Sequence, residues 1–367
     1  MSLTNYLYEQ LLPEENTCEN IEQSVSQTHT ESPELKCAKL PLGKPFYSTY
    51  HFQGIIGAIS LSNPSVRNWY LNESMSLCCE RVFLFGFSSP HINILQSSWL
   101  DTPCFDKLIY PMRFLQEHVH ELICKLIDNG YYVNFDGVDD YYLENKSWYQ
   151  RRHFCHDGLI YGYDEAQKTY DVYAYDSNWS YRGFKICQDS FVKGRDVMMQ
   201  QGTFGTICGV KPHMESVDFQ LPVVYTRLSE YLDSSMEKYP LDADGKVSGI
   251  VVHQYMAIYL DRLYHGLIQY NKMDWRIFRV IWEQKAFMLE RIQKIEQLLD
   301  LGNRFSKEYD EIVREANTAR MLYASHHQKR RDNVLPVIKK KLLAIYDRER
   351  KLLEDLLKHM DIEMRNH

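Results

Sequence analysis

The 367-residue sequence has no long apolar segment and no excess of basic residues. No run of eighteen apolar residues occurs, so we expect no membrane-spanning helix. The first residues, MSLTNYLYEQLLPEEN, lack the basic start and the small-residue cleavage site of a secretory signal peptide. The formal net charge is −7, whereas nucleic-acid-binding surfaces are basic. These absences argue against a membrane protein, a secreted protein and a nucleic-acid partner.

Motifs for cofactors and metals are missing as well. The sequence contains no GxxxxGKS/T, GxGxxG, HExxH or GxSxG, so no nucleotide site, zinc protease site or nucleophile elbow is indicated. The nine cysteines are an odd set without a CxxC pair, which indicates neither a disulfide framework nor a zinc site. We therefore expect a cytoplasmic protein with free thiols, no bound cofactor and no metal ion. Asp136, Asp139 and Asp140 are interpreted as turn residues, since their spacing does not match a calcium loop.

The remaining composition is that of a globular protein, with 44% hydrophobic and 25% charged residues. Residues 1–39 are interpreted as a short amphipathic helix followed by a polar arm. Residues 40–215 predict an α+β domain, in which helices precede a mostly antiparallel sheet. Residues 216–367 predict an α-helical domain, which could also mediate a homodimer. The expected fold class is thus α+β, followed by a helical C-terminal domain.

Hydrophobic periodicity and turn residues place the elements along the chain. In the α+β domain we expect helices at 53–61, 66–79, 111–129 and 190–200, strands at 131–135 and 204–210, strands or buried connectors at 82–85 and 92–95, and irregular chain at 103–110. In the helical domain we expect helices at 222–232, 247–267, 274–301, 307–324 and 335–359. Basic clusters at Arg330–Arg331 and 339–341 are typical of a solvated helix face; alternatively, they could form a landing surface for an acidic partner.

Residues 153–187 carry the clearest pattern in the sequence. Two strands rich in β-formers, from about His156 to Tyr163 and from Thr169 to Tyr175, flank a turn, and a third strand follows at 182–187. Antiparallel pairing brings the start of one strand beside the end of the next, so His156 and Asp176 should lie close together. A His held by an Asp supplies the general base and its orienting group in a nucleophilic triad. The structural alternative is a buried His bonded to a turn carboxylate.

The segment HDGLIYGYDEAQKTYDVYAYD resembles the His-to-Asp hairpin of papain-like cysteine enzymes of the butirosin biosynthesis acyltransferase type, which are associated with natural-product gene clusters. In that pattern a His starts a strand, a Gly-x-Asp turn follows six residues later, and an Asp ends the next strand. His156, Gly162, Asp164 and Asp176 match it. The segment WEQKAFMLERI is similar to the helical C-terminal part of the same group. The resemblance covers about residues 40–300.

The resemblance implies a cysteine-type acyltransferase or amide-forming ligase. Such an enzyme takes an acyl group from the phosphopantetheine thioester of an acyl or peptidyl carrier protein and passes it to a small amine. It implies His156 as the general base and Asp176 as its orienting residue. It also implies a cysteine at the start of the first core helix, where this sequence has Gln53-Gly54-Ile55. The other cysteines are weak candidates for a nucleophile. Four of them lie at positions that do not suit a papain-like nucleophile: Cys37, Cys79, Cys104 and Cys155. Three others are interpreted as core residues: Cys124, Cys187 and Cys208.

Three alternatives therefore stay open beside the covalent mechanism. His156 could deprotonate an amine for direct attack on a bound thioester, without a covalent intermediate. The domain could be a catalytically inactive papain-like binding module of such a pathway. It could also be a cysteine peptidase.

Overall fold

The computed structural model describes residues 36–95, 104–203, 205–212, 217–234 and 245–366. The predicted N-terminal helix at 1–12 lies outside the described residues, as does nearly all of the polar arm. Contacts within the chain group Lys36–His367 into one compact unit. The predicted division near residue 215 stays a prediction. None of the helices in the described ranges combines the length and the apolar character needed to cross a bilayer.

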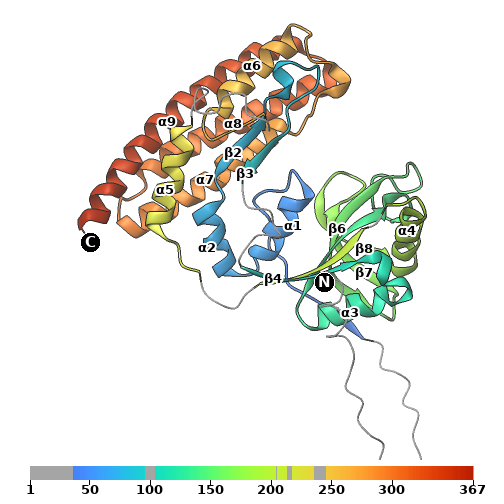
Figure 1. The fold of residues 1–367 in the computed structure, drawn as a ribbon. Helices are drawn as coiled ribbons and strands as arrows, with labels where there is room; N and C mark the ends of the chain where they lie inside the picture. The colour runs from blue at the N-terminus through green and yellow to red at the C-terminus, as the bar shows by residue number, and fades with distance from the viewer. Residues whose placement is uncertain (1–35, 96–103, 204, 213–216, 235–244, 367) are drawn as a thin grey trace, which may run out of the picture. The chain divides into compact units, whose positions relative to one another are not determined.

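An antiparallel sheet forms one part of this α+β structure (Figure 1). Within the described residues its strand order is β4-β9-β5-β6-β7-β8, and β1 pairs with the far end of β6. The strands are β1 (Cys37–Lys39), β4 (Phe105–Pro111), β5 (Tyr132–Asp139), β6 (Cys155–Asp164), β7 (Thr169–Tyr175), β8 (Tyr181–Cys187) and β9 (Thr206–Pro212).

Helices cover both faces of this sheet. Side chains of α3 (Val119–Asp128) and α4 (Gln188–Gln200) share a buried core with β5, β6, β7 and β9. The first helix, α1 (His51–Ser60), contacts β6 and β7, and Figure 1 shows the sheet between α1 and α4. A Cβ atom added at Gly54 of α1 would lie 2.5 Å from the ring of Tyr181 on β8. Glycine at this position therefore lets the start of α1 approach the sheet closely.

The second part of the structure is helical. Its long helices contact one another in sequence, α7 with α8 and α8 with α9, while α5 and α6 pack on α9 (Figure 1). Their bounds are α5 (Leu221–Asp233), α6 (Val252–Tyr264), α7 (Ile277–Leu299), α8 (Arg304–Lys329) and α9 (Leu335–Asn366). The predicted helices are found here, but two are shorter than expected: the one expected at 247–267 begins only at Val252, because Lys246–Ser248 is extended, and the one expected at 274–301 spans Ile277–Leu299. The other three are longer than expected at one or both ends. A small sheet of order β10-β2-β3 joins Lys246–Ser248 (β10) to Ser76–Glu80 (β2) and Ile92–Leu95 (β3).

Several local predictions were wrong. The helix expected at 66–79 ends early: α2 spans Pro64–Glu73, and the chain then enters strand β2. The segment 103–110, expected to be irregular, contributes strand β4, which pairs with β9 from Phe105↔Pro212 to Pro111↔Thr206. Pro111 does not open the next helix, because two short 3-10 turns, Met112–Phe114 and Gln116–His118, separate it from α3. Both new strands are fixed by partners more than ten residues away in sequence, which local periodicity does not register.

A buried polar network crosses the helical part. Lys285 of α7 lies 2.6 Å from the Glu349 carboxylate of α9, and both side chains are fully buried. Tyr231 and Tyr309 donate hydrogen bonds to the same carboxylate, and His253 Nε2 lies 3.7 Å from it. Burial alone would raise the pKa of Glu349, but the Lys285 charge and the hydrogen bonds from Lys285 and Tyr309 more than offset this and hold that pKa below its usual value.

This network makes stability depend on pH through His253. Burial, assisted by the Lys285 charge, lowers the pKa of His253 from 6.5 to about 4. Between these two values the unfolded chain binds the proton and the folded chain does not, so stability falls as the pH falls through this window. The full shift corresponds to about 3 kcal/mol of unfolding free energy. We expect urea unfolding at pH 7 and pH 4 to show this loss, and His253→Gln to reduce it. An identical loss in that variant would contradict the assignment.

Candidate functional site

Two stacked histidines lie at the point where α1 meets the sheet. His156 is the second residue of β6, and His51 is the first residue of α1. Their ring centroids are 4.2 Å apart with an interplanar angle of 27°. Tyr175, the last residue of β7, stacks on His51 at 5.2 Å. The first core helix thus begins two residues before Gln53, and a histidine stands at its start.

Each histidine is held by its own carboxylate. His51 Nδ1 lies 2.8 Å from Asp157 Oδ1, and the backbone N–H of Tyr175 donates to His51 Nε2 at 3.4 Å. His156 Nδ1 lies 3.0 Å from Asp140 Oδ2. We assign the Nδ1 proton to His156, because a carboxylate is the strongest acceptor near it. In this tautomer the Nε2 atom of His156 keeps its lone pair.

The structure does not bring Asp176 to His156 as the sequence predicted. Asp176 Oδ1 accepts the backbone N–H groups of Asn178 at 2.8 Å and Ser180 at 2.9 Å, and Arg182 donates to Oδ2. Burial would raise the pKa of Asp176, but these bonds hold it below its usual value. The chain turns immediately after β7, so this carboxylate caps the turn. The orienting position beside His156 belongs to Asp140.

Strand pairing explains why Asp140 occupies that position. β5 and β6 are antiparallel, with Val138 opposite His156, so the residues after β5 meet the start of β6. The backbone N–H of Asp140 bonds to the carbonyl of Phe154 at 2.9 Å. Asp140 was interpreted as a turn residue from the sequence. A sequence signal for Asp140 did exist. The strand predicted at 131–135, if paired with the first strand of the hairpin, would end beside His156, so a carboxylate just after that strand was a possible partner.

A buried lysine completes the group around Asp140. Lys146 Nζ lies 3.4 Å from Asp140 Oδ1 and 3.2 Å from His156 Nδ1, and Lys146 is only 3% exposed. Burial lowers its pKa, against the opposing effect of Asp140. Burial likewise lowers the pKa of His51, against Asp157. His51, stacked between the rings of His156 and Tyr175, is therefore suited to holding these rings in place as a neutral imidazole rather than to carrying a charge.

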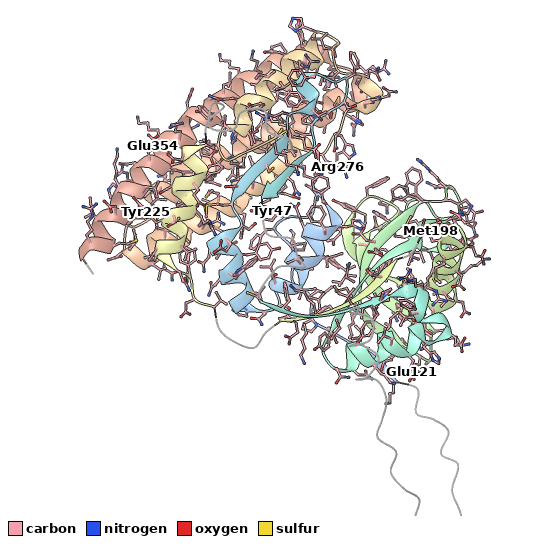
Figure 2. The ribbon with its side chains drawn as sticks, viewed as in Figure 1. Tyr47, Glu121, Met198, Tyr225, Arg276 and Glu354 are labelled. Carbon is pink, nitrogen blue, oxygen red and sulfur yellow. The ribbon has the colours of Figure 1, made fainter. Side chains whose placement is uncertain are left out.

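The histidines open into a cleft of about 620 Å³. His156 is a quarter exposed there, and the first turn of α1 forms part of the wall. The far wall is residues 271–276, which include Arg276, labelled in Figure 2. No cysteine is among the described residues that line the cleft. Cys37 and Cys155 are exposed, while Cys79, Cys104, Cys124 and Cys208 are buried. Cys155 directly precedes His156 on β6, so the two side chains point to opposite faces.

The donor atoms of His51, His156 and Asp157 lie within 4.8 Å of one another. Two histidines and one carboxylate are a common donor set for a divalent metal. A bound ion, however, lies in the plane of each imidazole ring, about 2.1 Å from its nitrogen. Two rings stacked 4.2 Å apart at 27° have planes that do not meet near the nitrogens. The donor types suit a metal and their orientation does not, so we assign no ion here.

No protein-family model matches the chain, and no curated protein matches it either.

Proposed function

We propose that this protein is a papain-like acyltransferase that forms an amide from a carrier-protein thioester and an amine, with His156 as general base and without an acyl-cysteine intermediate. The observation that carries the proposal is the environment of His156. Its Nδ1 atom is held by Asp140 at 3.0 Å. Its Nε2 atom lies 3.7 Å from Asp157 Oδ1, which is too far for a hydrogen bond, so its lone pair remains available to a ligand in the cleft. A base oriented in this way can accept a proton from a bound nucleophile.

The chemistry balances without a covalent enzyme intermediate. The amine nitrogen attacks the thioester carbonyl carbon, and His156 Nε2 takes a proton from that nitrogen. The carbon–sulfur bond then breaks, and the leaving thiolate takes the proton back from His156. Negative charge develops on the carbonyl oxygen between these steps. The N-terminus of α1 lines the cleft, and the partial positive charge of a helix N-terminus stabilises such an oxygen.

The absence of a cysteine from the described cleft lining favours this route over the covalent one. A papain-like nucleophile would stand at the start of the first core helix, next to the base. That position holds His51, whose Nδ1 atom is engaged with Asp157 at 2.8 Å and whose side chain is 6% exposed. Amine attack on the thioester needs only binding, orientation and proton transfer, which the cleft can supply.

A carrier protein fits the charge at one end of the cleft. A second cavity, of about 420 Å³, shares Trp179 and Trp275 with the first and is also lined by His327 and Gln328 of α8. The exposed basic residues Lys329, Arg330 and Arg331 follow directly on the chain. Carrier proteins are acidic, so a basic rim would steer them toward this opening. Of the cluster at 339–341, Lys339 is already paired with Asp261 at 2.6 Å.

The proposal is tested by incubating the full chain with acyl-N-acetylcysteamine thioesters and a small primary amine. We expect amide and free thiol to form together, with no acyl adduct on the intact protein by mass spectrometry. Protein with its thiols blocked should retain the activity. An adduct on one cysteine would establish the covalent route, and thiol release without amide would indicate a hydrolase or peptidase. If no thioester is turned over, the proposal is wrong, and a catalytically inactive binding module becomes the favoured function.

A further inference from the structure

The cleft around His156 is lined by aromatic rings and almost no aliphatic side chains. Among the described residues lining its two cavities there is no Leu, Ile or Val, and Met273 is the largest aliphatic side chain. The apolar surface comes instead from the rings of Tyr50, Phe52, Trp148, Phe154, Trp179 and Trp275. Aromatic rings in contact are stabilised beyond the area that they bury, so a ring gains more in such a cleft than an aliphatic group of the same size.

Several of these rings are exposed to solvent although they are large and apolar. Trp179 is 52% exposed, Trp275 40% and Phe154 38%. Trp179 contacts Trp148 edge-on at 6.1 Å, and Trp148 lies 6.2 Å from Phe154. These contacts fix the rings around a space that they do not fill themselves. A contiguous exposed aromatic surface in a cleft is typical of a ligand site.

The two indoles stand where the cavities join. Trp179 comes from the turn after β7, and Trp275 comes from the segment before α7. Both line both cavities, so a group that extends from His156 toward α8 passes between them. Volumes of about 620 and 420 Å³ are each in the range of small-molecule sites.

The charges in the cleft favour a neutral ring over a cation. Aromatic cages also bind quaternary ammonium groups, which are attracted to the ring faces. The two carboxylates that line this cleft are engaged elsewhere: Asp157 with His51 at 2.8 Å, and Asp274 with Arg276 at 3.0 Å. Lys272 adds positive charge to the same wall, and Arg276 is already neutralised by Asp274. A cationic ligand would meet the Lys272 ammonium without a free carboxylate to balance it.

We propose that the cleft selects an aromatic acyl group, held between Trp179 and Trp275 with its carbonyl carbon near His156. This inference rests on the proposed acyl transfer, because the selected ring is part of the acyl donor. Binding of the ring itself does not depend on turnover. The two proposals can therefore be tested separately.

The experiment measures binding of two non-transferable ketone analogues of acyl-N-acetylcysteamine by calorimetry on the full chain. One analogue carries a phenyl ring and the other a cyclohexyl ring, so the two have nearly the same size and differ in aromaticity. We expect the phenyl analogue to bind about threefold to tenfold more tightly than the cyclohexyl analogue. This is the gain in affinity that aromatic contacts contribute beyond the effect of the surface area that they bury. Trp275→Leu and Trp179→Leu should each reduce this preference, while Phe114→Leu, at an exposed ring outside the cleft, should leave it unchanged.

The outcomes separate the two proposals. Phenyl-selective binding that depends on the indoles, without amide formation from any thioester, would support aromatic selection and overturn the acyl transfer. Equal or tighter binding of the cyclohexyl analogue would overturn aromatic selection while leaving transfer intact. Tighter binding of tetramethylammonium than of the phenyl analogue would also overturn it, in favour of a cation cage. Circular dichroism of each variant shows whether the fold is retained.

Discussion

His156→Gln should lower kcat/KM for amide formation by about 10²–10⁴-fold, the usual contribution of a positioned general base. Glutamine approximates the size of the imidazole but cannot take a proton at neutral pH. Its amide can still reach Asp140, which lies 3.0 Å from His156 Nδ1 in the native protein. The loss should therefore fall mainly on kcat, because the aromatic walls of the cleft are unchanged. Steady-state assay of thiol release and amide formation gives both constants.

The matched control is His118→Gln, at a histidine whose side chain is 68% exposed and which does not line the cleft. It should retain full activity. A second variant, Asp140→Asn, should also lose activity, because the Nδ1 proton of His156 would lose its carboxylate and the favoured tautomer would change. Full activity in both His156→Gln and Asp140→Asn would remove His156 from the mechanism. Unchanged thermal unfolding would show that a loss of rate is not a loss of fold.

Glu349→Gln should destabilise the protein by about 3–5 kcal/mol, the usual cost of removing one partner of a buried ion pair. The substitution leaves the Lys285 ammonium in a site where both side chains are fully buried. It also weakens the acceptor for Tyr231 and Tyr309, which both bond to this carboxylate. Burial already lowers the pKa of Lys285, against the opposing effect of Glu349. Urea unfolding at pH 7 measures the change in unfolding free energy.

Two further variants show whether the unpaired charge is the cause. Glu354→Gln lies on the same helix, where Glu354, labelled in Figure 2, forms an exposed pair with Arg350 at 2.9 Å; it should cost less than about 1 kcal/mol. The double variant Lys285→Met with Glu349→Leu removes both charges and should recover much of the stability. If the double variant is as unstable as Glu349→Gln alone, the loss comes from packing rather than from charge.

The elements that the sequence predicted well are those whose pattern is local. The hairpin was expected at 156–163 and 169–175 and is found at Cys155–Asp164 and Thr169–Tyr175. The long helices after residue 221 also follow from periodicity. Strand β2 could not be found in this way, because Ser76–Glu80 continues an apolar spacing compatible with the preceding helix. It is extended because it pairs on both sides, with Ile92–Leu95 and Lys246–Ser248.

In the candidate site, too, the residue in a local sequence pattern was predicted and the residues placed by long-range contacts were not. His156 was found because it opens the hairpin, and its carboxylate was sought on the wrong neighbouring strand. In an antiparallel sheet both neighbours of β6 end beside its start, and sequence alone does not say which carboxylate turns inward. His51 was missed for a different reason. More than a hundred residues separate it from His156, and the contact exists only because α1 packs on β6 and β7.

The turn after β7 has a consequence for how tightly the cleft can hold a ligand. Trp179 has a φ of 58°, a left-handed backbone conformation that costs a non-glycine residue about 1–2 kcal/mol. The bonds from Asn178 and Ser180 to the Asp176 carboxylate offset that cost when the chain folds. The backbone at Trp179 is therefore already fixed before any ligand arrives, and the edge contact with Trp148 at 6.1 Å restrains the indole, so less conformational entropy is left to be lost on binding. Preorganisation of this kind should lengthen the residence time of a bound ring more than it speeds its entry.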